Sequence, residues 1–287
     1  MNQSFLVSDI HGSIDKCNKL FELIRTNKPD QLFIAGDIFP SSVFRFSKSF
    51  NIDEDSFFAF LTNGLKKLNA DLGVDYPKIF AILGNDDPKA LEELMISMEK
   101  SELLNYMSDN VIELEGYAIA GYSYVPPTPF RFKDWEKYDV SRFTDHGAIS
   151  PEEGIRTVPI DPIEIKYSTI HADLKKLKEQ IVQEKFIMLF HSPPYKTNLD
   201  RAGLDGKMIE HIQVDVHVGS IAIRKFIEEH QPVLTLHGHI HESTRITGSW
   251  KDKIENTVCF NAAHDGKELS VIQFDINDLS SAERILI

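Results

Sequence analysis

The amino-acid sequence predicts an α/β fold, because short apolar runs that end in small or polar residues alternate with longer stretches of helical period. A second observation supports this class: side chains that can bind metal ions follow directly after several of the apolar runs. A third is size, because a chain of 287 residues that is 42% hydrophobic and 26% charged can bury a large core. We therefore expect one domain that spans residues 1–287.

The start of the chain predicts a strand, a helix and a second, parallel strand. FLVSD (5–9) and LFIAGD (32–37) are the strands, and the segment between them carries apolar residues at helical spacing from Ile14 to Ile24. Cys17 lies on that apolar stripe, so we expect a small core residue there and not a ligand.

The rest of the chain continues the alternation. Further strands are predicted at 78–84, 115–124, 186–191, 233–238, 257–261 and 269–276, and helices at about 55–70, 88–99, 169–184 and 220–230. Ser220 is expected to be the N-cap of the last of these helices. Residues 122–167 break the pattern, because prolines and aromatic residues are dense there. We interpret this segment as a long excursion over one face of the fold and not as a second domain.

Composition excludes several classes of protein. The net charge of −13 argues against a broad basic face, so nucleic acid is not expected as a tightly bound partner. Two cysteines are too few for a disulfide framework, and no signal peptide is recognisable, so we expect a cytoplasmic protein. No apolar run approaches the roughly 20 residues of a membrane helix, so no membrane partner is expected.

Polar side chains that suit metal ions gather at the ends of predicted strands. They are Asp9 and His11, Asp37, Asn85, His191, and His239 with His241. Each has an ordinary explanation on its own, such as a turn residue, but loops at the carboxyl ends of strands converge over one place. A glycine precedes Asp37, Asn85 and His239, which lets the backbone turn sharply at each. The five loops together predict one shared site.

The motifs SDIHG, AGD, LGND, FHSPP and HGHIH resemble those of the calcineurin-like metallophosphoesterases, over most of the chain. The overall build is most similar to the small bacterial and archaeal members related to cyclic nucleotide phosphodiesterases. The resemblance implies two facing mixed β-sheets flanked by helices, with two metal ions at the strand ends.

The same resemblance assigns the ligands. One ion would be held by Asp9, His11, Asp37 and His241, and the other by Asp37, Asn85, His191 and His239. Asp37 would bridge the two ions. His237 matches no ligand position, so we expect a structural role for it.

Carboxylate, amide and imidazole ligands together favour Mn, Fe, Co, Ni or Zn over calcium or magnesium, and we expect manganese. A bridging carboxylate lets two ions approach to about 3.5 to 4 Å, where they bind phosphate oxygens and lower the pKa of a shared water. We therefore expect a metal-dependent phosphoesterase, and a phosphodiesterase in particular, in which that water attacks phosphorus in line on a small substrate.

Three alternatives stay open. The first is a phosphomonoesterase of the same fold. The second is a non-enzymatic protein-binding scaffold, although here every ligand position is filled. The third is hydrolysis of a bond without phosphorus, which fits the metal chemistry but not this order of motifs.

The stretch ILGNDDP departs from the family, since most members have a histidine where this chain has Asp86. A carboxylate has an ordinary pKa of about 4 and nearby cations lower it further, so Asp86 is a poor general acid. Either another group, such as His217 of HVGS, donates the proton, or the leaving groups need none. Asp87, directly before Pro88, is expected to cap the following helix.

Contacts to the substrate are the least defined part. Tyr124, Phe130, Arg131 and Trp135 of the excursion either form walls for a base or an aromatic leaving group, or pack onto the sheet. His264 is a weaker candidate of the same kind as His217 for a contact with phosphate.

Overall fold

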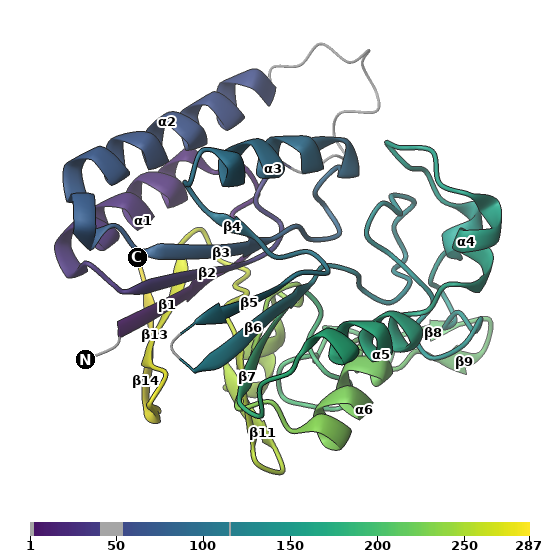
Figure 1. Cartoon of the computed structure of the whole chain (residues 1–287). Coiled ribbons are helices and arrows are strands. Elements are labelled where there is room, and N and C mark those ends of the chain that lie inside the picture. The colour runs from purple at the N-terminus through teal and green to yellow at the C-terminus, as the bar shows by residue number, and fades with distance from the viewer. Residues whose placement is uncertain (1–2, 41–53, 115) are drawn as a thin grey trace.

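A computed structural model of the chain describes residues 3–40, 54–114 and 116–287. Two six-stranded sheets lie face to face, and helices cover their outer faces (Figure 1). The helices α1 (Ile14–Asn27), α2 (Glu54–Leu72) and α3 (Glu92–Lys100) lie along the first sheet. The helices α5 (Ile170–Gln180) and α6 (Ile221–His230) lie along the second. The fold class that the sequence predicts is therefore confirmed.

The first sheet has its parallel strands in chain order. From one edge to the other it contains β14 (Asp278–Leu286), β13 (Ser270–Asp275), β1 (Gln3–Val7), β2 (Gln31–Ala35), β3 (Lys78–Ile82) and β4 (Asn105–Tyr106). The strands β1 to β4 run parallel, whereas β13 is antiparallel to β1 and β14 is antiparallel to β13. The carboxyl ends of β1, β2 and β3 therefore meet at one edge.

The second sheet has the same plan. It contains β11 (Lys251–Ile254), β12 (Thr257–Asn261), β10 (Leu234–His237), β7 (Phe186–Phe190), β6 (Tyr117–Tyr122) and β5 (Val111–Leu114). The four central strands are parallel, and β5 and β11 are antiparallel at the edges. A separate hairpin is formed by β8 (Met208–Ile209) and β9 (Ile212–Gln213).

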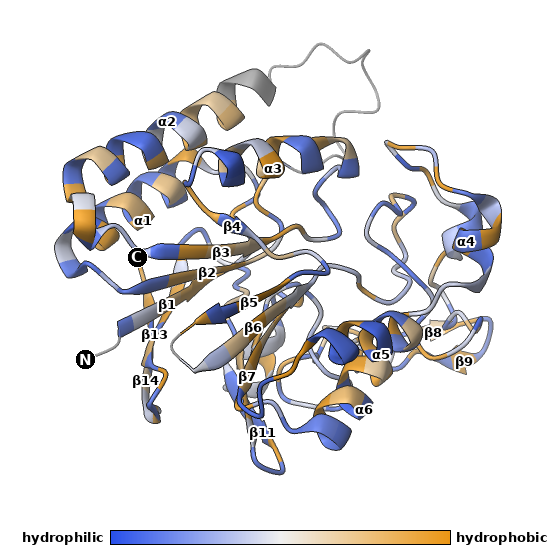
Figure 2. Ribbon diagram, viewed as in Figure 1, coloured by the Kyte–Doolittle hydropathy of each residue, from blue (hydrophilic) through white to orange (hydrophobic). Residues whose placement is uncertain are grey.

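The apolar layer between the sheets joins them. Phe274 of the first sheet packs against Phe260 of the second, with 5.6 Å between ring centroids, and Phe33 stacks on Phe274 at 6.1 Å. The central strands are accordingly hydrophobic along most of their length, while the helices turn hydrophilic residues outward (Figure 2). A second apolar cluster lies under the helices and includes Cys17, a buried core residue as predicted. Ile14 was expected on the same stripe but is 52% exposed, because it stands in the first turn of α1.

The excursion after β6 is mostly without regular structure. Between Tyr122 and Ile170 it contains one turn of 3-10 helix (Pro151–Glu153) and the short helix α4 (Pro162–Tyr167). Its Asp139 accepts hydrogen bonds from Ser220 Oγ (2.6 Å) and Ile221 N (2.7 Å), which ties the excursion to the start of α6. Ser220 caps α6 as predicted, since its Oγ accepts from Ile223 N.

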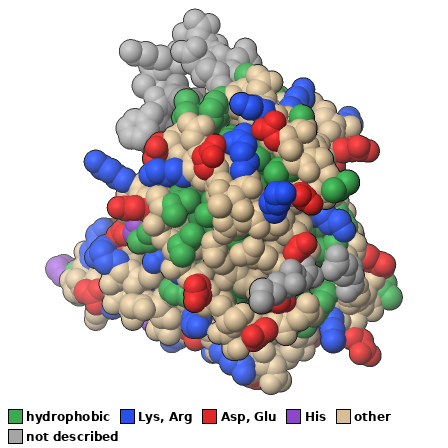
Figure 3. Space-filling view, turned by 90° about the vertical axis from the view of Figure 1, so that its left-hand side faces the viewer, with side chains coloured by type: hydrophobic (Ala, Val, Ile, Leu, Met, Phe, Trp, Pro, Cys, Tyr) green, Lys and Arg blue, Asp and Glu red, His purple; other side chains and the backbone are tan. Residues whose placement is uncertain are grey.

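The remaining short elements are α7 (Ser243–Thr247) and the 3-10 turns Gly73–Asp75 and Lys89–Leu91. Glu115, where the predicted strand 115–124 would begin, lies outside the described residues. Within the described ranges, no helix has the length and apolar character needed to cross a membrane. On the face shown in Figure 3, acidic and basic side chains are interspersed among apolar ones.

Candidate metal centre

Loops from both sheets meet at the carboxyl ends of the parallel strands. The loops after β1, β2 and β3 carry Asp9 with His11, Asp37, and Asn85, and those after β7 and β10 carry His191, and His239 with His241. Backbone hydrogen bonds hold the first two loops side by side, from Asp9 N to Gly36 O (3.1 Å) and from His11 N to Asp37 O (2.9 Å). The two sheets thus place side chains from distant parts of the chain opposite one another.

The backbone at the candidate ligands is strained. The φ angle is 56° at Asp9, 49° at His11, 52° at Asp37 and 75° at His239, all in the left-handed region. Such a conformation costs a non-glycine residue about 1 to 3 kcal/mol and persists only where the surrounding structure imposes it. Strain that recurs on three facing loops indicates a functional site.

Two glycines leave room for the Asp9 and Asp37 carboxylates against the backbone of neighbouring loops. A Cβ atom on Gly238 would lie 2.8 Å from Asp9 Oδ2, and one on Gly84 would collide with Asp37 Oδ1. Any larger residue at either position would displace the carboxylate, which explains why glycine precedes the ligand at both.

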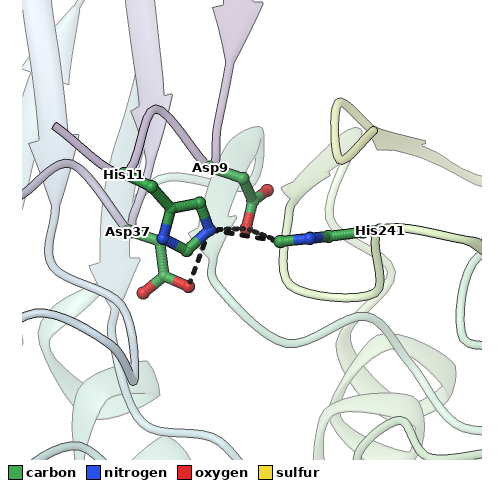
Figure 4. Close-up of side chains that lie close together, drawn as sticks. All are labelled: Asp9, His11, Asp37 and His241. Carbon is green, nitrogen blue, oxygen red and sulfur yellow. Dashed lines mark hydrogen bonds and ion pairs between the residues drawn. The ribbon is translucent and has the colours of Figure 1, made fainter. Parts of the chain in front are cut away.

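Asp9, His11, Asp37 and His241 form a compact cluster (Figure 4), and their candidate ligand atoms all lie within 4.8 Å of one another. His241 Nε2 is 3.0 Å from Asp9 Oδ1. His11 Nε2 is 3.9 Å from Asp9 Oδ1 and 3.8 Å from Asp37 Oδ2. Both carboxylates are buried, and both histidines remain partly open to solvent.

His191 brings a second group of atoms to Asp37. Its Nδ1 donates to Ala35 O at 2.6 Å, and its Nε2 faces Asn85 Oδ1 at 3.0 Å and Asp37 Oδ2 at 3.3 Å. The ring of His239 lies beside it, with 5.0 Å between ring centroids. Asp37 is therefore in contact with both groups of side chains.

The geometry requires positive charge at these atoms. With its proton on Nδ1, a neutral His191 turns a nitrogen lone pair toward two oxygen atoms. The Nε2 atoms of His11 and His241 lie 3.3 Å apart, a hydrogen-bond distance if one of them carries a proton. A proton on Nε2 of His191 or a divalent ion removes the repulsion there, and nitrogen and oxygen donors together suit borderline divalent ions.

The ionisation of these groups supports the same conclusion. Burial lowers the pKa of His191, but the carboxylate of Asp37 outweighs it and raises the pKa to about 10. The pKa of His241 is raised to about 9 in the same way, with burial opposed by Asp9. Burial raises the pKa of Asp37, yet His191 lowers it to about 2. Asp9, His11, Asp37 and His241 form a group that could hold a metal ion.

His237 lies apart from the cluster. Its Nδ1 donates to Ser192 O at 2.9 Å, its Nε2 accepts from Thr235 Oγ1 at 2.7 Å, and its ring stacks on Phe190. Burial lowers its pKa to about 3, so the ring is neutral. These contacts give His237 the structural role expected for it.

The segments next to His217 are hydrogen-bonded to two of the ligand loops. Ser220 N donates to Pro193 O (2.9 Å) in the loop after His191, and Gly203 N donates to Glu242 Oε1 (3.1 Å) next to His241. The segments that carry His217 and Gly203 are joined by an antiparallel bridge.

The ring of His217 is fixed by a buried carboxylate. Its Nδ1 donates to Asp200 Oδ1 at 2.8 Å, while 26% of the side chain stays exposed. Asp200 itself accepts backbone N–H groups from Lys196, Thr197 and Gly219, so it cannot swing away. His264 instead pairs with Glu268 Oε2 at 3.3 Å.

The prediction that Asp87 caps the following helix is wrong. Asp87 is fully buried, and its carboxylate accepts the N–H groups of Ile38 (3.1 Å), Phe39 (2.7 Å) and Gly84 (2.8 Å). Those three donors belong to two ligand loops. A buried N–H group without an acceptor loses more free energy than an N–H group at a helix end that water can reach. Pro88 is extended, and the helix predicted at 88–99 starts as a 3-10 turn without a side-chain cap.

The predicted aromatic walls divide into two pairs. Tyr124 and Trp135 are buried against each other, with ring centroids 5.2 Å apart, and Lys89 Nζ lies 4.3 Å from the Trp135 ring centroid. Packing onto the sheet is therefore the correct interpretation for these two rings. Phe130 is 55% exposed and Arg131 is exposed as well.

Three residues near the site were missed by sequence reasoning. Lys16 donates from Nζ to Asp9 O at 2.9 Å, and Asp87 and Asp200 bind backbone N–H groups of the loops described above. Most of their partners are main-chain atoms, which leave no pattern in the sequence.

A family profile, a curated protein and solved structures are similar to this chain over most of its length. The profile of the family described as calcineurin-like phosphoesterase matches residues 5–243. An uncharacterized protein of Methanocaldococcus jannaschii is 26% identical over 279 residues, covering 94% of this chain and 95% of that protein. The crystal structure of a Thermus thermophilus protein superposes with a TM-score of 0.57 at 16% identity, covering 99% of this chain and 98% of the other. A further crystal structure gives a TM-score of 0.59 at 15% identity, with 100% and 98% covered. At such identities the two structures show a shared fold.

Proposed function

Because the chain belongs to the calcineurin-like phosphoesterase family, metal-dependent hydrolases of phosphoester bonds, we propose that it is a phosphodiesterase that uses two divalent ions. The observation that carries this proposal is the position of Asp37. Its Oδ2 lies 3.8 Å from His11 Nε2 on one side and 3.3 Å from His191 Nε2 on the other. A carboxylate in contact with two groups of ligands is suited to bridging two ions.

The proposed ligand sets are those expected from the sequence. One set is Asp9, His11, Asp37 and His241, and the other is Asp37, Asn85, His191 and His239. When bound, the two ions would offset the charge of the phosphate and lower the pKa of a water shared between them for in-line attack on phosphorus. Manganese is the proposed metal, and the cytoplasm the proposed location.

The protein's own contribution is to fix its side chains before the substrate arrives. The contact from His191 Nδ1 to Ala35 O holds the ring with Nε2 turned toward Asp37. The backbone hydrogen bonds between the loops of Asp9 and Asp37 fix the position of one carboxylate relative to the other. Preorganised groups of this kind need no rearrangement during the reaction.

Which esters the protein cleaves depends on the groups that can donate a proton to the leaving group. Asp86 lies 3.7 Å from His11 Nδ1, and a carboxylate has an ordinary pKa of only about 4. It is therefore a poor acid for an alkoxide leaving group. We propose His217, oriented by Asp200, as the group that supplies a proton where the leaving group needs one.

A panel of phosphoesters on the manganese-loaded protein tests this function. The panel compares bis-p-nitrophenyl phosphate, p-nitrophenyl phosphate, cyclic nucleotides, dinucleotides and single-stranded DNA. We expect diesters to be hydrolysed faster than monoesters and single-stranded DNA not to be degraded processively, because a net charge of −13 does not retain a polyanion. Faster hydrolysis of the monoester would favour a phosphomonoesterase. Hydrolysis of neither ester would favour the scaffold alternative.

A further inference from the structure

We propose that Asp86 is a positioning residue that sets the orientation and the tautomer of His11 as a metal ligand, an inference that rests on the metal site proposed above. Asp86 Oδ2 lies 3.7 Å from His11 Nδ1. The other nitrogen of the same ring, Nε2, faces Asp9, Asp37 and His241. The two nitrogens of His11 therefore have separate surroundings, one with a single carboxylate and one with the cluster.

The position of Asp86 bears on which nitrogen of His11 carries the proton. A neutral imidazole has one N–H donor and one nitrogen acceptor. A carboxylate next to Nδ1 favours the proton there, and the lone pair on Nε2 is then free for a cation in the cluster. Metal-binding histidines commonly donate their second nitrogen to a carboxylate or a backbone carbonyl, which fixes the ring and strengthens the ligand.

His191 shows why His11 depends on such a partner. The side chain of His191 is fully buried, and its Nδ1 is held by Ala35 O at 2.6 Å. The side chain of His11 is 25% exposed, so packing alone does not fix its ring. At His11 the group that faces Nδ1 is the Asp86 carboxylate, at 3.7 Å, an ion-pair distance and not a hydrogen bond.

Asp86 is held by the loop that carries Asp37 and by its own neighbour Asn85. Its backbone N–H donates to Asp37 Oδ1 at 2.9 Å, and its Oδ1 accepts from Asn85 Nδ2 at 3.4 Å. The carboxylate therefore keeps a constant relation to Asp37 while its second oxygen faces His11. The acid at the position where most of the family has histidine thus acts on the metal site and not as a proton donor.

The test is a direct measurement of manganese binding, by isothermal titration calorimetry in competition with a chelator. Asp86→Ala removes both the charge and the acceptor, whereas Asp86→Asn keeps an oxygen that can accept from His11 Nδ1. Asp15→Asn is the matched control, because it removes one charge from the first turn of α1, where the side chain is 70% exposed and pairs with Lys19.

We expect Asp86→Ala to weaken the binding of one manganese ion by about 10- to 100-fold. Asp86→Asn should lower the manganese affinity by a smaller factor than Asp86→Ala. Asp15→Asn should change that affinity by less than about threefold. In a His11→Ala background, Asp86→Ala should cause no further loss, since a residue that acts through His11 has nothing left to act on. Thermal unfolding without metal confirms that each variant is folded.

Wild-type manganese affinity in a folded Asp86→Ala protein would overturn the proposal. If Asp86→Ala lowered the manganese affinity equally with and without His11, the proposal would be overturned. The same holds if Asp15→Asn lowered the affinity as much as Asp86→Ala, because the effect would then be one of charge in general. Hydrolysis is scored separately. A protein that binds manganese as described but cleaves no phosphoester would refute the proposed function. An active enzyme whose manganese affinity does not change when Asp86 is replaced would refute this inference alone.

Discussion

Replacing Asp37 with asparagine should impair the site more than the same change at Asp9. Asp37 Oδ2 contacts His11 Nε2 of one proposed ligand set and His191 Nε2 of the other, at 3.8 Å and 3.3 Å. Asp9 Oδ1 contacts His241 Nε2 at 3.0 Å and His11 Nε2 at 3.9 Å, both from the same set. Asparagine keeps an oxygen that can accept from Asp86 N, so the loop should stay folded.

The magnitude follows from the number of ions affected. Loss of a group that only supports a ligand lowers metal affinity by about 10- to 100-fold, so loss of a ligand charge should lower it by about 100-fold or more. For Asp9→Asn that is about 2.8 kcal/mol at one ion, since a tenfold change is about 1.4 kcal/mol. Asp37→Asn weakens the binding of both ions, which amounts to about 5.6 kcal/mol for the doubly loaded protein.

The assay is metal content after dialysis against a manganese buffer, together with calorimetric titration of each metal-free variant. Asp9→Asn should retain one ion and Asp37→Asn should retain neither at a concentration that fills the wild-type protein. If Asp37→Asn kept two ions with unchanged affinity, Asp37 would not bridge two metal sites.

Three further predictions test separate parts of the site. Asp87→Ala should lower the free energy of unfolding by about 3 to 5 kcal/mol in a denaturant titration, because three buried N–H groups lose their acceptor; a loss below about 1 kcal/mol would contradict that role. Manganese affinity should rise as the pH increases from about 7 to 9, because protons held on His191 and His241, with pKa values of about 10 and about 9, must leave before either ring binds a cation. An affinity that is constant over this range would remove both histidines from the ligand sets. Asp86→His should increase activity on monoesters, and Asp86→Ala should keep most of the activity on an aryl diester at saturating manganese; abolished turnover with both ions bound would make Asp86 catalytic.

The parts of the fold that sequence reasoning predicted are those where burial leaves a periodic signal. The central strands, such as β2 and β7, are buried along their whole length and read as continuous apolar runs. The edge strands β11 and β14 were missed because most of their residues are polar and partly or fully exposed. The predicted single domain over residues 1–287 and the cytoplasmic location stay predictions.

The candidate site was predictable to the extent that its residues follow strands. Asp9, Asp37 and His191 each come within two residues of the end of a buried strand, and parallel strands bring such ends together. Asp87 was not predictable as a buried acceptor, because its donors Ile38 and Phe39 lie 49 and 48 residues away along the chain. Contacts of that kind depend on the relative positions of loops, which only the folded structure defines.

The most direct test of the central claim is the restoration of phosphodiester hydrolysis after removal of metal. The purified protein is treated with a chelator until no metal is detected, and hydrolysis of bis-p-nitrophenyl phosphate is then followed as manganese is added. We predict no hydrolysis without metal and recovery that saturates at two manganese ions per chain. Undiminished hydrolysis by a protein with verified absence of metal would contradict the account.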